Sequence, residues 1–205
     1  MKKIILVAAI AVAGVWSASA QSFGVKAGYN HANLSGDTPT DLDFKANSGF
    51  YVGALVELSL TDFFAIQPEV IYSRQGAKAK ILTVENTLNM DYLNVPVMAK
   101  VKLGDSFSVL AGPQFGFLIG DPEWKTDLGS GTTTDLGKDS FAKFDVGLGI
   151  GAMFKTAGGL FVDARYTHGL TNTFDKDNDS WNNISIGDKN DFKNSVFSIG
   201  LGFIF

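Results

Sequence analysis

Large apolar residues alternate with small or polar residues along most of the chain. Between positions 144 and 154, for example, Phe144, Val146, Leu148 and Ile150 alternate with Asp145, Gly147, Gly149 and Gly151. A period of two is typical of a β-strand whose two faces meet different surroundings. Eight segments show this pattern and are predicted strands: Ser22–Asn30, Gly49–Leu60, Phe64–Ser73, Met90–Leu103, Phe107–Ile119, Phe141–Lys155, Leu160–Thr171 and Ser195–Phe205.

The connections between these segments alternate in length. The short connections "TD", "GDS" and "TAGG" have the residue types of tight turns, whereas those at 31–48, 74–89, 120–140 and 172–194 are long and polar. Short turns at one end and long loops at the other are typical of an up-and-down meander. The sequence therefore predicts an all-β fold, an eight-stranded antiparallel up-and-down barrel.

The charged residues within the predicted strands all fall on one face. Five cations and four anions share it: Lys26, Glu57, Glu69, Lys100, Lys102, Lys143, Asp145, Asp163 and Arg165. A soluble lipocalin-like barrel is apolar inside, and a transmembrane barrel is the reverse. Near-balanced charge among many glycines favours a narrow lumen in which side chains pair, because they do not reach bulk water. We therefore predict a transmembrane β-barrel with a lumen charge network, and the soluble barrel is the alternative.

The opposite, apolar face carries aromatic residues near the strand ends, as the interfacial girdles of a membrane barrel do. Three prolines interrupt the predicted strands: Pro68, Pro96 and Pro113. Each removes a hydrogen-bond donor from the ladder, and β-bulges would accommodate them there.

The first twenty residues are typical of a secretory signal peptide. Two lysines precede an apolar stretch that ends in Ala18-Ser19-Ala20, an A-x-A cleavage site. This predicts a cleaved segment at 1–20 and one barrel domain at 21–205. The chain has no cysteine, which excludes disulfides and thiolate chemistry, and its net charge of −4 argues against a nucleic-acid partner.

The sequence contains no strong motif for catalysis, cofactor binding or metal binding. "GLGIGA" at 147–152 matches a dinucleotide fingerprint in form but lies within a predicted strand, where its glycines make room for long side chains. "DKDNDS" at 175–180 resembles the start of a calcium loop but lacks the glycine and glutamate of that motif. His31 and His168 belong to no Ser/His/Asp pattern. We predict no enzyme activity, no cofactor and no metal site.

In the last predicted strand, large apolar residues on one face alternate with small residues on the other. Phe197, Ile199, Leu201, Phe203 and Phe205 alternate with Ser198, Gly200 and Gly202. The apolar set is expected to face outer-membrane lipid, and the strand to close the barrel against the first. A terminal aromatic on such a strand resembles the signal that the barrel-assembly machinery reads, so these five residues are the predicted assembly signal.

Several stretches resemble the PorT-like outer-membrane β-barrel family of Bacteroidota. They include "AIQPEVIYSRQGAK", "MDYLNVPVMAKVKLG", "LAGPQFGFLIG", "LFVDARYTHGLTN" and "KNSVFSIGLGFIF". The resemblance spans nearly the whole mature chain and includes the three prolines. It implies an eight-stranded barrel of the OmpA/OmpX type in the bacterial outer membrane, with periplasmic termini. The founding member is linked to protein secretion, a role that fold alone does not transfer.

Two functions remain open on this basis. The first is a non-catalytic barrel with a structural role, or one whose loops 120–140 and 172–194 present a surface to a protein or glycan partner. The same loops, polar and with tryptophans at 124 and 181, are equally consistent with solvated segments. The second is a narrow channel, or an accessory component of an outer-membrane transport or secretion system.

Overall fold

The computed structural model describes residues 21–35, 44–81, 84–127, 132–135, 142–171 and 193–205. No helix in this part of the chain is long and apolar enough to cross a membrane. The described residues form ten strands: β1 (Gln21–Ser35), β2 (Phe44–Ser59), β3 (Phe64–Ile81), β4 (Val84–Leu103), β5 (Phe107–Leu118), β6 (Glu123–Asp127), β7 (Thr132–Asp135), β8 (Phe144–Lys155), β9 (Leu160–Gly169) and β10 (Lys193–Ile204).

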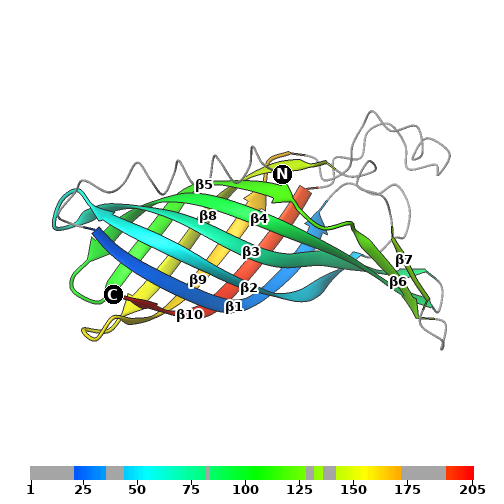
Figure 1. Cartoon of the computed structure of the whole chain (residues 1–205), viewed down its shortest axis with the longest axis horizontal. Coiled ribbons are helices and arrows are strands. Elements are labelled where there is room, and N and C mark those ends of the chain that lie inside the picture. The colour runs from blue at the N-terminus through cyan, green and yellow to red at the C-terminus, as the bar shows by residue number, and fades with distance from the viewer. Residues whose placement is uncertain (1–20, 36–43, 82–83, 128–131, 136–141, 172–192) are drawn as a thin grey trace.

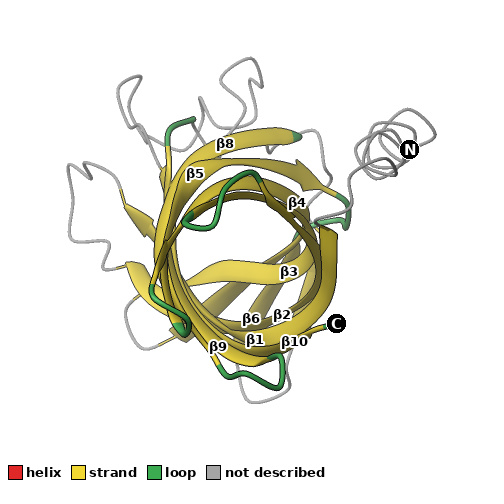
Figure 2. Cartoon of the chain, turned by 90° about the vertical axis from the view of Figure 1, so that its left-hand side faces the viewer, coloured by secondary structure: helices red, strands yellow, loops and turns green. Residues whose placement is uncertain are grey.

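Eight of these strands close into a barrel (Figures 1 and 2). Each pairs antiparallel with its neighbour in the order β3-β2-β1-β10-β9-β8-β5-β4, and β3 also pairs with β4. The pairing of β1 with β10 runs from Gly24 opposite Ile204 to Ser35 opposite Lys193. The predicted eight-stranded antiparallel barrel is confirmed, including its closure by the last strand.

The strands β3 and β4 extend well beyond the barrel at the end where the long connections lie. Their ladder continues from Arg74 opposite Asp91 to Ile81 opposite Val84. The prediction of a long loop over 74–89 is therefore wrong, because most of that segment is strand. The segment lacks the two-faced apolar pattern since it has left the barrel wall. The short strands β6 and β7 add to the outer part of β4, within the predicted loop 120–140. Figure 1 shows this projecting sheet.

The two barrel faces differ as the period of two predicts. Apolar side chains such as Val52, Leu148 and Ile150 point outward and are more than half exposed. The outward apolar surface ends at Tyr72 on β3 and Leu93 on β4. The next outward positions are Arg74 and Asp91, whose side chains lie 3.7 Å apart. Charge on the outer face thus begins where the projecting sheet begins.

The three prolines interrupt the ladders without changing their register. Pairing of β3 with β4 stops at Pro68 opposite Val97 and resumes at Ile71 opposite Asn94, in the same register. The ladder between β4 and β5 has a similar gap beside Pro113. The bulges that would accommodate the prolines are therefore absent from these ladders. The register shift of β2 against β3 lies elsewhere, between Ala46 and Tyr51.

Candidate functional site

The lumen is crossed near its middle by a group of buried charges. Arg165 on β9 forms two hydrogen bonds with the Glu69 carboxylate on β3, at 2.7 and 3.1 Å. Three strands separate β9 from β3 in either direction around the barrel, so these strands form opposite walls. This bidentate pair therefore spans the lumen from wall to wall.

Two further side chains tie this pair to the remaining walls. Lys26 Nζ on β1 lies 3.0 Å from Glu69 Oε2 and 3.1 Å from Asp163 Oδ2. The Tyr51 hydroxyl on β2 donates to Asp163 at 3.2 Å. We call Lys26, Tyr51, Glu69, Asp163 and Arg165 the central cluster. All five are at most 4% exposed, and their two positive and two negative charges cancel.

Glycines on β1 and β10 make room for the central cluster. A Cβ at Gly28 would lie 2.7 Å from Tyr51 Cε1, and a Cβ at Gly200 would collide with the Tyr51 hydroxyl. The Tyr51 ring thus lies against the glycines of two neighbouring strands, and its hydroxyl reaches β9 beyond them. In the same way, Phe161 of β9 occupies the space that a side chain at Gly202 would need.

An apolar layer lies next to the central cluster, on the side of the short turns. Its residues come from six of the eight barrel strands and are at most 7% exposed: Leu55, Met98, Leu110, Met153, Phe161 and Ile204. Each of these six strands contributes one side chain, so the layer follows most of the inner wall. Apolar packing of this kind leaves little room for a file of water.

A second group of charges lies closer still to the turns. Glu57 accepts from Lys100 at 2.7 Å through one oxygen and from Lys102 at 2.8 Å through the other. Lys100 also contacts Gln67 Oε1 at 3.4 Å and the Met153 sulfur at 3.2 Å. We call Glu57, Lys100 and Lys102 the turn-end cluster.

Uncharged polar side chains fill the lumen on the loop side of the central cluster. Asn30 and Gln75 both donate to the Ser73 hydroxyl, at 2.7 and 2.8 Å, and Asn194 donates to Gln75 at 2.6 Å. A cavity of about 30 Å³ lies between this network and the central cluster. That volume holds little more than a single water molecule.

Seven of the nine charges predicted to share the lumen lie in these two clusters, and the other two lie elsewhere. Asp145 is half-buried and accepts from the Thr171 hydroxyl at 2.5 Å. Lys143 precedes β8, which begins at Phe144 rather than at Phe141, and it is exposed. Sequence reasoning did not identify Tyr51 and Gln67 as partners of the charges. The sequence shows only that both residues lie on the same strand face as the charges.

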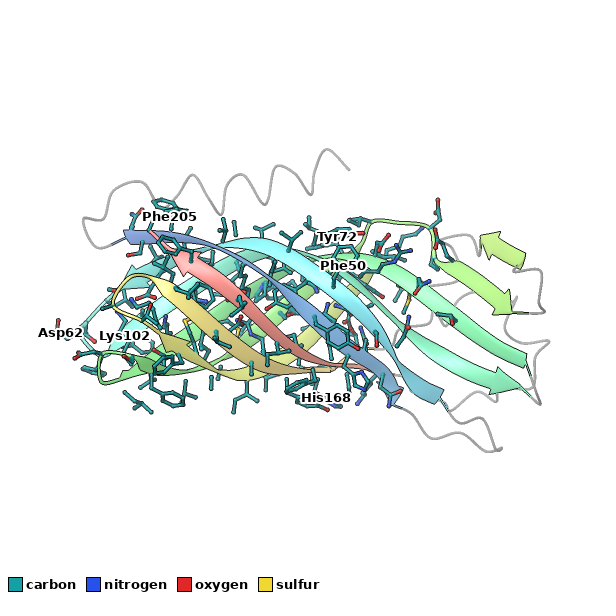
Figure 3. The ribbon with its side chains drawn as sticks, turned by 90° about the horizontal axis from the view of Figure 1, so that it is seen from below. Phe50, Asp62, Tyr72, Lys102, His168 and Phe205 are labelled. Atoms are coloured by element: carbon teal, nitrogen blue, oxygen red, sulfur yellow. The ribbon has the colours of Figure 1, made fainter. Side chains whose placement is uncertain are left out.

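The remaining predicted features lie within β8, on the outer face of β10 or outside the described residues. The glycines of "GLGIGA" lie inside β8 and face the lumen, and no helix follows them. Residues 1–20, the "DKDNDS" motif and most of loop 172–194 lie outside the described residues. The predicted assembly-signal side chains point outward and are 39% to 75% exposed: Phe197, Ile199, Leu201, Phe203 and Phe205. Figure 3 shows Phe205 at the turn end of the barrel, with Phe50 and Tyr72 toward the other end.

The described residues contain no complete catalytic or metal site. His168 Nδ1 lies 3.1 Å from the Ser195 hydroxyl on the outer face, but in this part of the chain no carboxylate is bonded to that imidazole. A catalytic base is normally oriented by such a third group. No group of three or more His, Cys, Asp or Glu side chains in the described residues is placed to hold a metal ion.

Comparisons with known proteins agree with this geometry. The family model described as "Outer membrane protein beta-barrel domain" matches residues 19–175. No curated protein sequence matches the chain. Among solved structures, the attachment invasion locus protein Ail of Yersinia pestis is 16% identical, with 90% of this chain and 98% of that chain covered and a TM-score of 0.50. Neisserial surface protein A is also 16% identical, with 89% and 97% covered and a TM-score of 0.50. These two likenesses concern the fold alone.

Proposed function

Because the chain belongs to the outer membrane protein β-barrel domain family, we propose that it is a non-catalytic barrel that acts outside the membrane, through the sheet and loops at its loop end. The observation that carries this proposal is the Arg165–Glu69 pair, which braces opposite walls of the lumen. A barrel that is closed in this way has its outer surfaces available for function, rather than its interior.

The lumen argues for a structural core and against a channel. The interior of an eight-stranded barrel is filled by its own side chains, whereas aqueous porins have about sixteen strands. Here the central cluster is neutral and buried, and the apolar layer lies directly beside it. Passage of ions would require breaking buried ion pairs, and leaving one partner unpaired costs about 3–5 kcal/mol. The narrow-channel alternative therefore gains no support from the lumen.

The projecting sheet is the surface best suited to a partner. It extends the barrel wall through β3, β4, β6 and β7, with β7 as its last strand in the described part of the chain. Its base lies at Arg74, which is ion-paired with Glu123 at 3.0 Å and marks the end of the outward apolar surface. A hydrogen-bonded sheet that extends beyond the barrel loses less conformational entropy on binding a protein or glycan than an unpaired loop would lose.

The same proposal includes the cellular location of the protein and its orientation in the membrane. The protein resides in the bacterial outer membrane, in contact with its lipid. We propose that residues 1–20 are removed as a signal peptide, that both termini of the mature chain are periplasmic, and that the projecting sheet faces the exterior. We also propose that the barrel-assembly machinery inserts it and that it is a PorT-like member of its family, as the motifs indicate. A role as an accessory component of secretion would then be one use of the projecting sheet.

Photo-crosslinking in intact cells tests the proposal. A photoreactive amino acid is placed at Thr133 on β7, and the matched control carries it at Gly158 in the turn between β8 and β9. We expect one crosslinked species of constant mass from Thr133 and none of that mass from Gly158. Identical products from both positions, or none from any position along β6 and β7, would contradict the proposal.

Planar-bilayer recording of the purified barrel tests the channel alternative. We expect no steady conductance from the parent protein, because paired and apolar side chains fill the lumen. Steady single-channel steps that disappear after exchange of Glu69 or Lys100 would favour the channel. In that case the crosslinking result would decide whether the projecting sheet has a separate role.

A further inference from the structure

A cleft opens at the turn end of the barrel, below the turn-end cluster. Its volume is about 230 Å³, and it is lined by Lys100, Lys102 and Lys155 with Ser106, Ser108 and Gly104, and by Asp62 and Asp105 at the turns. The three lysines come from β4 and β8, which flank β5 on either side. Figure 3 shows Lys102 near this mouth and Asp62 farther out, at the tip of its turn.

The charges that point inward at this end do not cancel. Lys100, Lys102 and Lys155 contribute three positive charges, and Glu57 contributes one negative charge, which leaves an excess of two. Glu57 pairs with Lys100 and Lys102, and it forms no ion pair with Lys155 in the described residues. The central cluster, in contrast, is neutral.

The two aspartates at the rim do not remove this excess. Asp62 and Asp105 are exposed on the β2–β3 and β4–β5 turns. Neither forms an ion pair with a lysine of the cleft in the described residues. Exposed charges are screened by water and salt, so their influence on an ion within the cleft is weak compared with that of inward ammonium groups.

Donors for a ligand remain free in the cleft. Lys102 uses two of its three donors, on Glu57 and on Ser59 at 2.9 Å. The Lys155 ammonium forms no hydrogen bond or ion pair with the described residues, and Ser106 and Ser108 line the same cleft. Two ammonium groups and two hydroxyls in a concave mouth suit a compact anion with several acceptor oxygens.

We propose that the turn-end cleft binds a phosphate group, with Lys102 and Lys155 as the charged donors and Ser106 and Ser108 as hydroxyl donors. Lys100 supports the site by holding Glu57 in place from the lumen side. The site is independent of the projecting sheet, because it lies at the opposite end of the barrel. Its test therefore does not depend on the crosslinking experiment.

Inorganic phosphate is the probe. The full mature barrel is refolded in octyl glucoside, a detergent without phosphate, with lysine side chains labelled with carbon-13 at the ε position. Phosphate is titrated at pH 8. We expect saturable shifts of the Lys102 and Lys155 signals, with a Kd on the order of 1 mM or lower. The signal of Lys193, at the other end of the barrel, should not move.

Two variants make the result specific. Lys155→Gln should weaken phosphate binding about tenfold, the effect of losing one charge-assisted hydrogen bond. It is the cleaner variant because Lys155 has no partner in the described residues to leave unpaired. The matched control Lys193→Gln should bind phosphate like the parent. Thermal unfolding of both variants checks that the barrel is intact. Shifts that rise linearly without saturation, or equal binding by all three proteins, would overturn the proposal.

A second arm separates free phosphate from the phosphate of a lipid headgroup. The same labelled protein is placed in nanodiscs of phosphatidylglycerol without added phosphate. Bound-state shifts of Lys155 in these discs would identify the lipid phosphate as the ligand. Shifts that appear only on addition of inorganic phosphate would identify a soluble one. Absence of both would refute the site.

Discussion

Replacing Glu69 by glutamine tests whether the central cluster is a buried, neutral brace. Glu69 accepts two hydrogen bonds from Arg165 and one from Gln67 at 2.7 Å, and it is ion-paired with Lys26. Glutamine keeps the shape but presents an NH₂ group to donors, and the charge of the cluster changes from zero to +1. Because the residue is 2% exposed, water does not compensate. We expect the free energy of unfolding to fall by about 3–5 kcal/mol.

The measurement is urea unfolding of the barrel in lipid vesicles, followed by circular dichroism and by the gel mobility of folded against unfolded protein. Glu123→Gln is the matched control. Glu123 also pairs with an arginine, Arg74, at 3.0 Å, but its side chain is about a third exposed. Removal of an exposed pair changes the free energy of unfolding by about 0–1 kcal/mol. Burial is the main difference between the two substitutions.

A second substitution separates the charge balance from the individual contacts. Adding Lys26→Met to Glu69→Gln returns the cluster to neutrality, with Arg165 opposite Asp163 at 4.0 Å. The double variant should be more stable than Glu69→Gln alone, although it has lost one more ion pair. If the double variant is less stable, or if Glu69→Gln costs no more than Glu123→Gln, then the lumen is hydrated and the brace interpretation is wrong.

Two further predictions concern the turn end of the barrel. Gly104 has a φ of +80°, so Gly104→Ala should lower the free energy of unfolding by about 1–2 kcal/mol in the same urea assay. Gly158→Ala, in open space, should stay within about 0.5 kcal/mol of the parent, and equal effects would contradict the backbone argument. Deletion of Phe205, three-quarters exposed at the end of the chain, should reduce the amount of barrel in outer-membrane fractions far more than deletion of one residue from loop 172–194. Normal levels of the truncated protein would exclude an assembly signal there.

The barrel and its two faces could be predicted from the sequence because both depend on a local rule. In a strand, neighbouring residues point to opposite sides, so Phe144 and Asp145 face different surroundings whatever the rest of the chain does. The same rule places Gly200 and Gly202 toward the lumen. It also places Tyr51 there, but it does not give the direction in which that long side chain leans.

The partners of the lumen charges could not be predicted in this way. Glu69 and Arg165 are 96 residues apart, and their contact depends on the strand order, the register of each ladder and the tilt of the strands. The extension of β3 and β4 was missed for a different reason. Beyond Arg74 the hairpin leaves the barrel wall, and its sequence lacks the alternation that identifies a half-buried strand. Strand pairing continues without it, because each added residue extends an existing ladder.

The glycines of β1 and β10 connect the stability of this barrel with its closed lumen. Because Gly28 and Gly200 carry no side chain, the Tyr51 ring lies against β1 and β10, and its hydroxyl reaches Asp163 on β9, the next strand beyond Gly200. Asp163 then holds Lys26, which holds Glu69, so the charges meet directly rather than through water. In a wider barrel the same residues would line an aqueous pore. In this narrow barrel they instead pair directly across the lumen and hold opposite walls together. A substitution that hydrates the lumen should therefore weaken the fold and admit ions together.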